Sequence, residues 1–180
     1  FNSDFWEFDP NQNKWRNINP LPIQGETVPE NWGRQFPFVF QIDNRTFVGG
    51  GSHGAEYLND IWEFIPPNNV TDKGTWKFYN WFPGTARDES FSLSLNGKGY
   101  LGLGYHGRLG YFRDFWQFDP NAPLNLQWKQ LADFPGESRG SVIAFTLNGQ
   151  IYVGGGLGKK TTANEFIPTY PTDFWTYIPT

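Results

Sequence analysis

The chain has 180 residues, 14 basic and 18 acidic side chains and a formal net charge of −4, and 19% of its residues are aromatic. High aromatic content with low net charge excludes intrinsic disorder, and the lack of a run of about 18 apolar residues excludes a membrane-spanning helix. A mildly acidic chain without a basic cluster is also a poor binder of nucleic acid.

Cysteine and methionine are both absent, and the first residue is Phe1. The absence of cysteine excludes disulfides, zinc–thiolate sites and cysteine nucleophiles within these residues, and it leaves the redox compartment undefined. The absence of a starting methionine predicts that the chain is a fragment or a processed product.

The first repeated pattern along the chain is Asp-x-Trp-x-aromatic, which occurs four times. Its tryptophans are Trp6, Trp62, Trp116 and Trp175, which lie 54 to 59 residues apart. The alternation of aromatic residues is typical of a strand that packs on both of its faces. A proline follows each copy and ends the predicted strand, because proline cannot donate to a β-ladder.

A second pattern begins with an arginine and recurs between these copies. The three copies start at Arg34, Arg87 and Arg139. The turn pairs Asn96-Gly97 and Asn148-Gly149 follow in the second and third copies, and they favour type I′ hairpins, which need positive φ at both positions. The second strand of each hairpin ends in a glycine-rich segment, which permits close approach of a backbone or a ring.

Each repeat therefore predicts four short antiparallel strands at a period near 50 residues, which is typical of a β-propeller blade. We predict an all-β propeller with blade pieces at residues 1–24, 34–82, 87–134 and 139–180. These pieces amount to about three and a quarter blades, whereas closed propellers have about four to eight. We therefore expect the remaining blades to come from a longer form of this chain or from another chain. The alternative is an ordinary β-sandwich.

This set of motifs resembles the kelch-repeat family. The family's signature is a glycine pair that ends one strand, an aromatic residue in the next and a tryptophan that starts the last. Here these are Gly50-Gly51, Phe64 and Trp76, and the chain departs from the pattern at Leu103, which stands between two glycines. The closer match is to kelch domains of exported bacterial proteins. The resemblance implies a kelch-type β-propeller that is secreted, periplasmic or at the cell surface.

Propeller ligands usually bind at one end of the channel, where the loops between strands two and three meet the loops between blades. On this ground we predict seven ligand-binding residues: Arg34, Arg87, Arg139, His53, His106, Tyr105 and Tyr111. The two histidines occupy matching repeat positions, but they fall short of the three or four ligands of a metal site. We expect no metal there, and we leave open whether the histidines contact a ligand or are ordinary polar loop residues.

The repeated arginines have two interpretations. A ring of guanidinium groups at the channel mouth would bind a carboxylate or a sulfate through paired hydrogen bonds. Alternatively, each arginine is a structural residue that pairs with Asp88, Glu89, Glu137 or a carbonyl group of the adjacent blade. The structural interpretation is favoured, since a residue repeated in every blade usually serves the shared fold.

For function, the leading prediction is a non-catalytic binding or scaffold module, without a cofactor, that presents its loops to a protein or glycan partner. Aromatic side chains are enriched in recognition surfaces, and Tyr57, Tyr105, Tyr111 and Phe112 lie on the predicted loops. No nucleic-acid partner and no membrane span are expected.

The alternative is a carbohydrate-active enzyme whose active site lies partly in other blades, because the kelch family includes sugar epimerases and oxidases of the galactose oxidase type. The oxidase centre uses a Tyr–Cys crosslink, and this chain has no cysteine. An epimerase needs acid–base groups in the channel. Glu26, Glu30 and Glu56 are candidates for this role, and no spacing singles one of them out.

Overall fold

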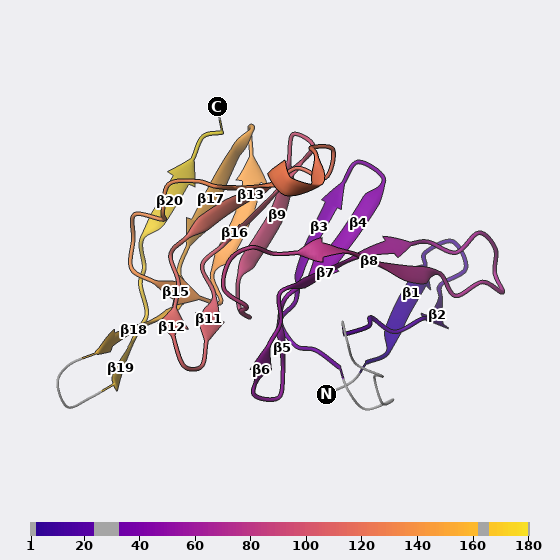
Figure 1. The fold of residues 1–180 in the computed structure, drawn as a ribbon, viewed down its shortest axis with the longest axis horizontal. Helices are drawn as coiled ribbons and strands as arrows, with labels where there is room; N and C mark the ends of the chain where they lie inside the picture. The colour runs from indigo at the N-terminus through magenta and orange to yellow at the C-terminus, as the bar shows by residue number, and fades with distance from the viewer. Residues whose placement is uncertain (1–2, 24–32, 162–165, 180) are drawn as a thin grey trace.

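The computed structural model describes residues 3–23, 33–161 and 166–179. Within these ranges, every regular element is a β-strand except one short 3₁₀ helix, η1 (Leu124–Leu126). The strands form four blade sheets and three smaller sheets (Figure 1). The described part of the chain contains no helix with the length and apolar character that a membrane crossing requires.

The blade sheets follow one another along the chain, and all of their strand pairs are antiparallel. The first sheet pairs β1 (Phe5–Asp9) with β2 (Lys14–Ile18). The second contains, in spatial order, β3 (Phe38–Ile42), β4 (Arg45–Gly49), β7 (Asp60–Ile65) and β8 (Thr75–Trp81). The third contains β9 (Phe91–Leu95), β10 (Lys98–Gly102), β13 (Phe115–Phe118) and β14 (Trp128–Gln130). The fourth contains β16 (Ile143–Leu147), β17 (Gln150–Gly154) and β20 (Phe174–Tyr177).

The three smaller sheets extend the connections between strands two and three, and Figure 1 shows them at one end of the molecule, which we call the hairpin end. One pairs β5 (Ser52–His53) with β6 (Glu56–Tyr57), and one pairs β11 (Tyr105–His106) with β12 (Gly110–Tyr111). In the third, β18 (Leu157–Thr161) lies between β15 (Arg139–Gly140) and β19 (Phe166–Thr169). The loops predicted to bind a ligand therefore begin as short hairpins that project from the same end.

Neighbouring blade sheets pack through aromatic side chains near their first strands, and β9 contacts both β3 and β16. Phe40 on β3 stacks on Phe118 of the next sheet, with ring centroids 5.6 Å apart. Gly99 makes room for the Phe40 ring, since a Cβ on this glycine would lie 2.7 Å from it. Each buried aromatic side chain removes about 150–250 Å² from water, so a few rings stabilise the contact between two small sheets.

Two backbone hydrogen bonds repeat between neighbouring sheets. The Gly51 amide donates to the Arg87 carbonyl and the Gly104 amide donates to the Arg139 carbonyl, each over 2.9 Å. Both glycines have positive φ, 83° and 101°, a conformation in which other residues are strained. A Cβ on Gly104 would also lie 2.6 Å from the Asp88 carbonyl. The predicted role of these glycines, close approach of two backbones, is confirmed.

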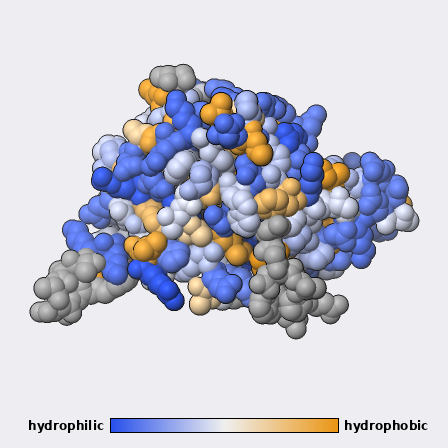
Figure 2. Space-filling view, viewed as in Figure 1, coloured by the Kyte–Doolittle hydropathy of each residue, from blue (hydrophilic) through white to orange (hydrophobic). Residues whose placement is uncertain are grey.

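The face of the fourth blade sheet that points away from the third is uncovered. Phe38 and Ile42 on β3 are buried, but Ile143 and Leu147, at the matching positions of β16, are 63% and 54% exposed. On the face of the molecule seen in Figure 2, apolar side chains likewise reach the surface in several patches. An uncovered blade face is expected of a partial propeller, because each blade normally packs on a neighbour.

We expect the 180-residue chain to self-associate through this face, because a large exposed apolar patch favours contact with another surface. Sedimentation velocity should show concentration-dependent oligomers, and Ile143→Lys combined with Leu147→Lys should shift the population toward monomer. Val70→Lys, which changes an exposed loop residue, is the matched control and should leave the oligomers in place. A monodisperse monomer of the unaltered chain at high concentration would contradict this prediction.

Candidate functional site

The three predicted arginines form ion pairs with the aspartate that begins the Asp-x-Trp pattern of the same blade. The pairs are Arg34–Asp60, Arg87–Asp114 and Arg139–Asp173. Two guanidinium nitrogens reach the two carboxylate oxygens in each pair, at 2.7 and 2.8 Å for Arg34. The ring nitrogen of the tryptophan two residues later donates to the same carboxylate in every copy. The repeated arginine and the repeated Asp-x-Trp pattern are therefore two halves of one structural contact.

The arginine side chains are only 1–4% exposed. Phe112, one of the aromatic residues predicted to recognise a partner, covers the Arg87 guanidinium at 4.0 Å. The predicted carboxylate partners, Asp88, Glu89 and Glu137, are wrong, because in the folded blade the aspartate of the third strand reaches the guanidinium instead. We leave the arginines out of the candidate site because they are buried and both terminal guanidinium nitrogens of each one bond to the protein itself.

Three tyrosines and one histidine, on β6, β11 and β12, gather at the hairpin end. Tyr105 and Tyr111 face each other across the β11–β12 hairpin, with ring centroids 4.8 Å apart. Tyr57 on β6 lies against the imidazole of His106, with centroids 4.3 Å apart, and its ring also meets Tyr105 at 6.4 Å. The structure therefore brings together three of the predicted site residues, Tyr105, His106 and Tyr111.

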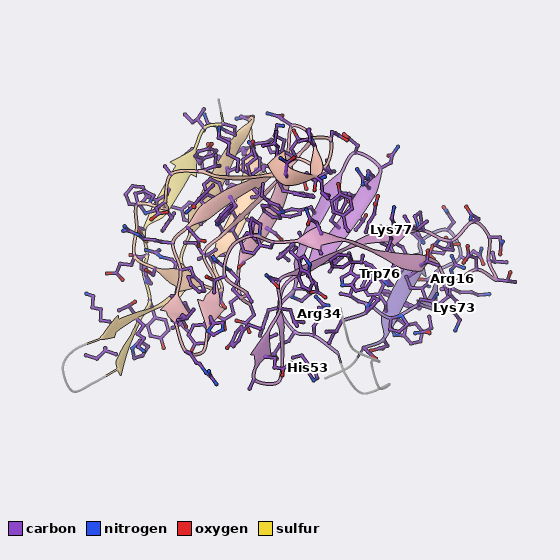
Figure 3. All side chains as sticks on the ribbon, viewed as in Figure 1. Arg16, Arg34, His53, Lys73, Trp76 and Lys77 are labelled. Atoms are coloured by element: carbon purple, nitrogen blue, oxygen red, sulfur yellow. The ribbon has the colours of Figure 1, made fainter. Side chains whose placement is uncertain are left out.

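The other histidine, His53, has a different environment. Its Nδ1 lies 2.9 Å from the Gly33 carbonyl, and Figure 3 shows it on the β5–β6 hairpin, with Arg34 set deeper toward the sheets. The matching repeat positions of the two histidines do not give them matching contacts. Among the residues that the structure describes, no group of three His, Cys, Asp or Glu side chains is arranged to hold a metal ion.

A cleft of about 530 Å³ separates the tips of the two tyrosine-bearing hairpins, and we call it the hairpin cleft. It is lined by Ala55, Glu56, Tyr57, His106, Gly107 and Arg108. Of the three predicted acid–base candidates, Glu56 lines this cleft, whereas Glu26 and Glu30 lie outside the described residues. The cleft is lined by two aromatic rings that pack on each other and by two charged side chains of opposite sign.

A buried carboxyl, Asp88, lies at the base of the β11–β12 hairpin and is not among the residues that line the cleft. Asp88 is 5% exposed, and its backbone pairs with Tyr105 at the base of the β11–β12 hairpin. The Ser52 hydroxyl donates to its Oδ2 over 2.7 Å, while its Oδ1 has no hydrogen-bond partner. Burial raises the pKa of Asp88, although the Ser52 hydrogen bond and the charge of nearby His106 act in the opposite direction. Burial therefore works against the charged form of the Asp88 carboxyl.

The next residue, Glu89, supplies a second carboxyl. Its Oε2 accepts a hydrogen bond from the Ser141 hydroxyl over 3.0 Å, and its φ is 54°, a left-handed conformation that is costly for a residue with a side chain. Burial raises the pKa of Glu89, and the charge of Asp88 raises it further. Asp88 thus contacts β5 of the preceding repeat, and Glu89 contacts the loop that leads into the fourth blade sheet.

The tyrosines nearest these carboxyls hold their protons firmly. Burial and the charge of Glu89 raise the pKa of Tyr111 to about 12. Burial and the charge of Asp88 raise the pKa of Tyr57 as well. At neutral pH, both hydroxyls are therefore available as hydrogen-bond donors.

The importance of Asp88 and Glu89 was not predicted beyond a role as arginine partners. The signal that finds them is a departure from the repeat: after the repeated arginine, the three copies read Gln35-Phe36, Asp88-Glu89 and Gly140-Ser141. All three second residues share positive φ, from 50° to 54°. The backbone is common to the blades, whereas the acidic pair occurs in one copy, which is typical of a residue that serves a site.

No protein-family model matches the chain. Two of its relatives are N-acetylneuraminate epimerases. The one from Haemophilus influenzae (strain PittEE) is 37% identical over 87 residues, which cover 45% of this chain and 22% of the relative. The one from Salmonella arizonae is 30% identical over 97 residues, which cover 54% and 23%. The matched segments thus span less than a quarter of these relatives.

A solved structure described as "Structure of YjhT" matches the fold with a TM-score of 0.74 at 14% sequence identity, covering 97% of this chain and 59% of that chain. At this identity the likeness concerns the fold alone, a β-propeller. The predicted fold class is confirmed. Together with the epimerase relatives, it supports a kelch-like propeller.

Proposed function

We propose that this protein is a carbohydrate-active β-propeller that holds a sugar at its hairpin end and exchanges protons with it through Asp88 and Glu89. The observation that carries the proposal is the buried Asp88 carboxyl, with an unpartnered Oδ1, within electrostatic reach of Tyr57 and His106 at the hairpin cleft. The relatives named N-acetylneuraminate epimerase support sugar chemistry. Both favour the carbohydrate-active alternative over the non-catalytic module predicted first.

The hairpin cleft suits a sugar because it combines flat apolar surfaces with polar groups. The stacked pair of Tyr57 and His106 supplies an apolar wall against which the C–H bonds of a sugar ring would lie, and a few directed polar groups would fix its orientation. The hydroxyl of Tyr57 stays protonated at neutral pH and is a donor to sugar oxygens. Arg108 and Glu56 at the rim are available for charged or hydroxyl substituents.

The carboxyl pair suits an epimerisation that proceeds by opening and closing a cyclic sugar. Asp88 in its neutral form gives a proton to the ring oxygen as the ring C–O bond breaks, while ionised Glu89 takes the proton of the neighbouring hydroxyl. Ring closure on the other face returns both protons and inverts the carbon, so atoms and charges balance. Two carboxyls in different environments that share one proton are a common solution for acid–base catalysis.

The proposal is tested by offering the purified protein N-acetylneuraminate and neutral hexoses, with calorimetry to measure binding and NMR exchange spectroscopy to measure interconversion of their cyclic forms. Saturable binding and faster interconversion of at least one sugar are expected. Failure of every sugar to bind would contradict the proposal. The protein or glycan partner, the lack of a cofactor and the secreted, periplasmic or cell-surface location stay predictions.

We expect Tyr57→Ala to weaken sugar binding by about three- to tenfold, because one aromatic contact contributes about 0.5–1.5 kcal/mol. Calorimetry with the sugar that binds best gives the measurement. Trp15→Ala is the matched control, since Trp15 is an exposed aromatic residue on β2 of the first blade sheet, and its removal should leave the affinity unchanged. Equal affinities for the Tyr57 variant and the unaltered protein would count against the hairpin cleft.

A further inference from the structure

The fourth blade sheet has an open outer edge at β20, because no strand of the described residues pairs with β20 on the side away from β17 (Figure 1). In the second and third blade sheets, β8 and β14 pair with this edge of the third strand. Phe115 and Asp119 both make backbone hydrogen bonds to the β14 segment, each over 2.8 Å, so alternate residues of the third strand face the fourth. Thr176 occupies the repeat position of Gln117, midway between them, and its amide and carbonyl therefore face outward.

A cavity of about 340 Å³ lies beside this edge, between the third and fourth blade sheets. Three rings, those of Phe134, Trp175 and Tyr177, form part of its wall. The rest of the wall is mainly apolar and includes two aspartates, Asp114 and Asp133. The volume lies within the range of about 300–1,000 Å³ that is usual for ligand pockets, so the cavity has room for an aromatic side chain.

The contact between two neighbouring blade sheets, which we call a seam, shows what such a place accepts. In the seam between the second and third blade sheets, the indole of Trp128 fills the matching position. Its ring centroid lies 5.0 Å from that of Phe82, 6.5 Å from that of Trp116 and 4.8 Å from that of Phe118. The three rings of the cavity wall occupy the same positions of the next repeat, in the same order. The cavity is therefore the counterpart of a place that holds an indole.

The seam between the first and second blade sheets repeats this arrangement. There Trp76 packs against the cluster that contains Leu21 and donates to the Asn19 carbonyl over 2.9 Å. In both seams the tryptophan lies at or near the start of the fourth strand, and a lysine follows it, Lys77 in β8 and Lys129 in β14. The chain's own repeats thus specify both the backbone and the side chain that fit beside β20.

We propose that the cavity and the outer edge of β20 form a docking site for a partner polypeptide that presents an extended segment beginning Trp-Lys. The segment adds to the fourth blade sheet as an antiparallel strand, and its indole enters the cavity against Trp175. Main-chain hydrogen bonds at Thr176 hold the strand, and the cavity selects its aromatic side chain. The site shares no lining residue with the hairpin cleft, so it does not depend on the proposed function.

The test uses a fluorescein-labelled synthetic peptide with the sequence of residues 126–133, which carries the β14 strand and its tryptophan. Its binding to the purified 180-residue protein is followed by fluorescence polarisation, and saturable binding is expected. The same peptide with Trp128→Ala should bind at least about thirtyfold more weakly, the loss typical of an anchor residue in a binding hot spot.

Two variants of the protein test the two halves of the site. Thr176→Pro removes the outward amide of β20, a change that an edge strand tolerates, and it should weaken peptide binding by about tenfold or more. Thr176→Val is the matched control, because it keeps the amide and should leave the affinity unchanged. Ala132→Phe adds a ring at the cavity wall, where Ala132 is exposed, and it should also weaken binding. Circular dichroism shows that each variant is folded.

The outcomes distinguish a partner strand from other occupants. Absence of peptide binding, or equal affinities for the peptide and its Trp128→Ala form, would overturn the proposal. Binding of free indole without binding of the peptide would make the cavity a small-molecule pocket and would overturn the strand. If no peptide binds and Thr176→Pro shifts the protein's own oligomers toward monomer, the edge belongs to a second copy and the proposal fails. Should Thr176→Pro not fold, Ala132→Phe and the two peptides decide the question in the same way.

Discussion

Replacing Arg87 with methionine will lower the free energy of unfolding by about 3–5 kcal/mol, because it leaves the Asp114 carboxylate without its cation inside the protein. The Arg87 side chain is 1% exposed and bonds to both oxygens of Asp114. It also donates to the Leu103 carbonyl over 3.1 Å. Urea denaturation followed by tryptophan fluorescence measures the change.

A second substitution distinguishes the stability lost with the ion pair from the stability lost because a core side chain has changed. Arg87→Met combined with Asp114→Asn removes the unpaired charge, so the double variant should recover part of the lost stability. Arg113→Met is the control at the surface. The Arg113 and Asp133 side chains are exposed and 3.4 Å apart, and loss of such a pair costs less than about 1 kcal/mol. Equal losses from Arg87→Met and Arg113→Met would refute the structural role of the buried pair.

The propeller was predictable because its determinants are local and repeated. Asn96-Gly97 and Asn148-Gly149 form their hairpin turns with positive φ at all four residues, as the residue types require. The tryptophan that starts the last strand lies opposite the aromatic residue of the third, as in Phe118–Trp128. Features of this kind depend on neighbouring residues within one hairpin. The repetition of the pattern then predicted that the hairpins are arranged as the blades of a propeller.

The contacts that join distant parts of the chain were less predictable. The carboxylates predicted to pair with the arginines were Asp88, Glu89 and Glu137, but the partner of Arg87 is Asp114, 27 residues away, which the folded blade brings within reach of the guanidinium. The Ser52–Asp88 hydrogen bond crosses between two sheets and depends on the packing of one blade on the next. Sequence spacing identifies the residues that occur in every blade. The candidate site, in contrast, consists of residues that occur in one blade only.

Asp88→Asn should reduce turnover of the sugar by about 10²–10⁴-fold, the usual contribution of a general acid, while the protein stays folded. Asparagine has nearly the same shape as aspartate and still accepts from Ser52, but it has no proton to transfer. The measurement is the interconversion rate by NMR, with calorimetry to show that the sugar still binds. Glu89→Gln should also lower turnover, since it removes the base.

The pH dependence of stability distinguishes this role from a structural one. Burial raises the folded-state pKa of Asp88 above its unfolded value, so the stability linked to this group is fully present below the unfolded pKa and is lost as pH rises through the folded pKa. Asparagine does not titrate. Asp88→Asn should therefore remove this loss and leave the protein as stable as, or more stable than, the unaltered protein at neutral pH.

Asp119→Asn is the matched control, because the pKa of Asp119 is shifted in the direction opposite to that of Asp88. The hydrogen bond from Lys98 holds the pKa of Asp119 below its ordinary value, so its contribution to stability is present above the unfolded pKa and is lost as pH falls through the folded pKa. This variant should lose stability at neutral pH and keep its turnover. If Asp88→Asn instead behaves like Asp119→Asn, losing stability with turnover intact, then Asp88 is a structural carboxyl and the acid–base proposal fails. A carboxyl whose removal costs turnover but not stability is one that the fold maintains for chemistry.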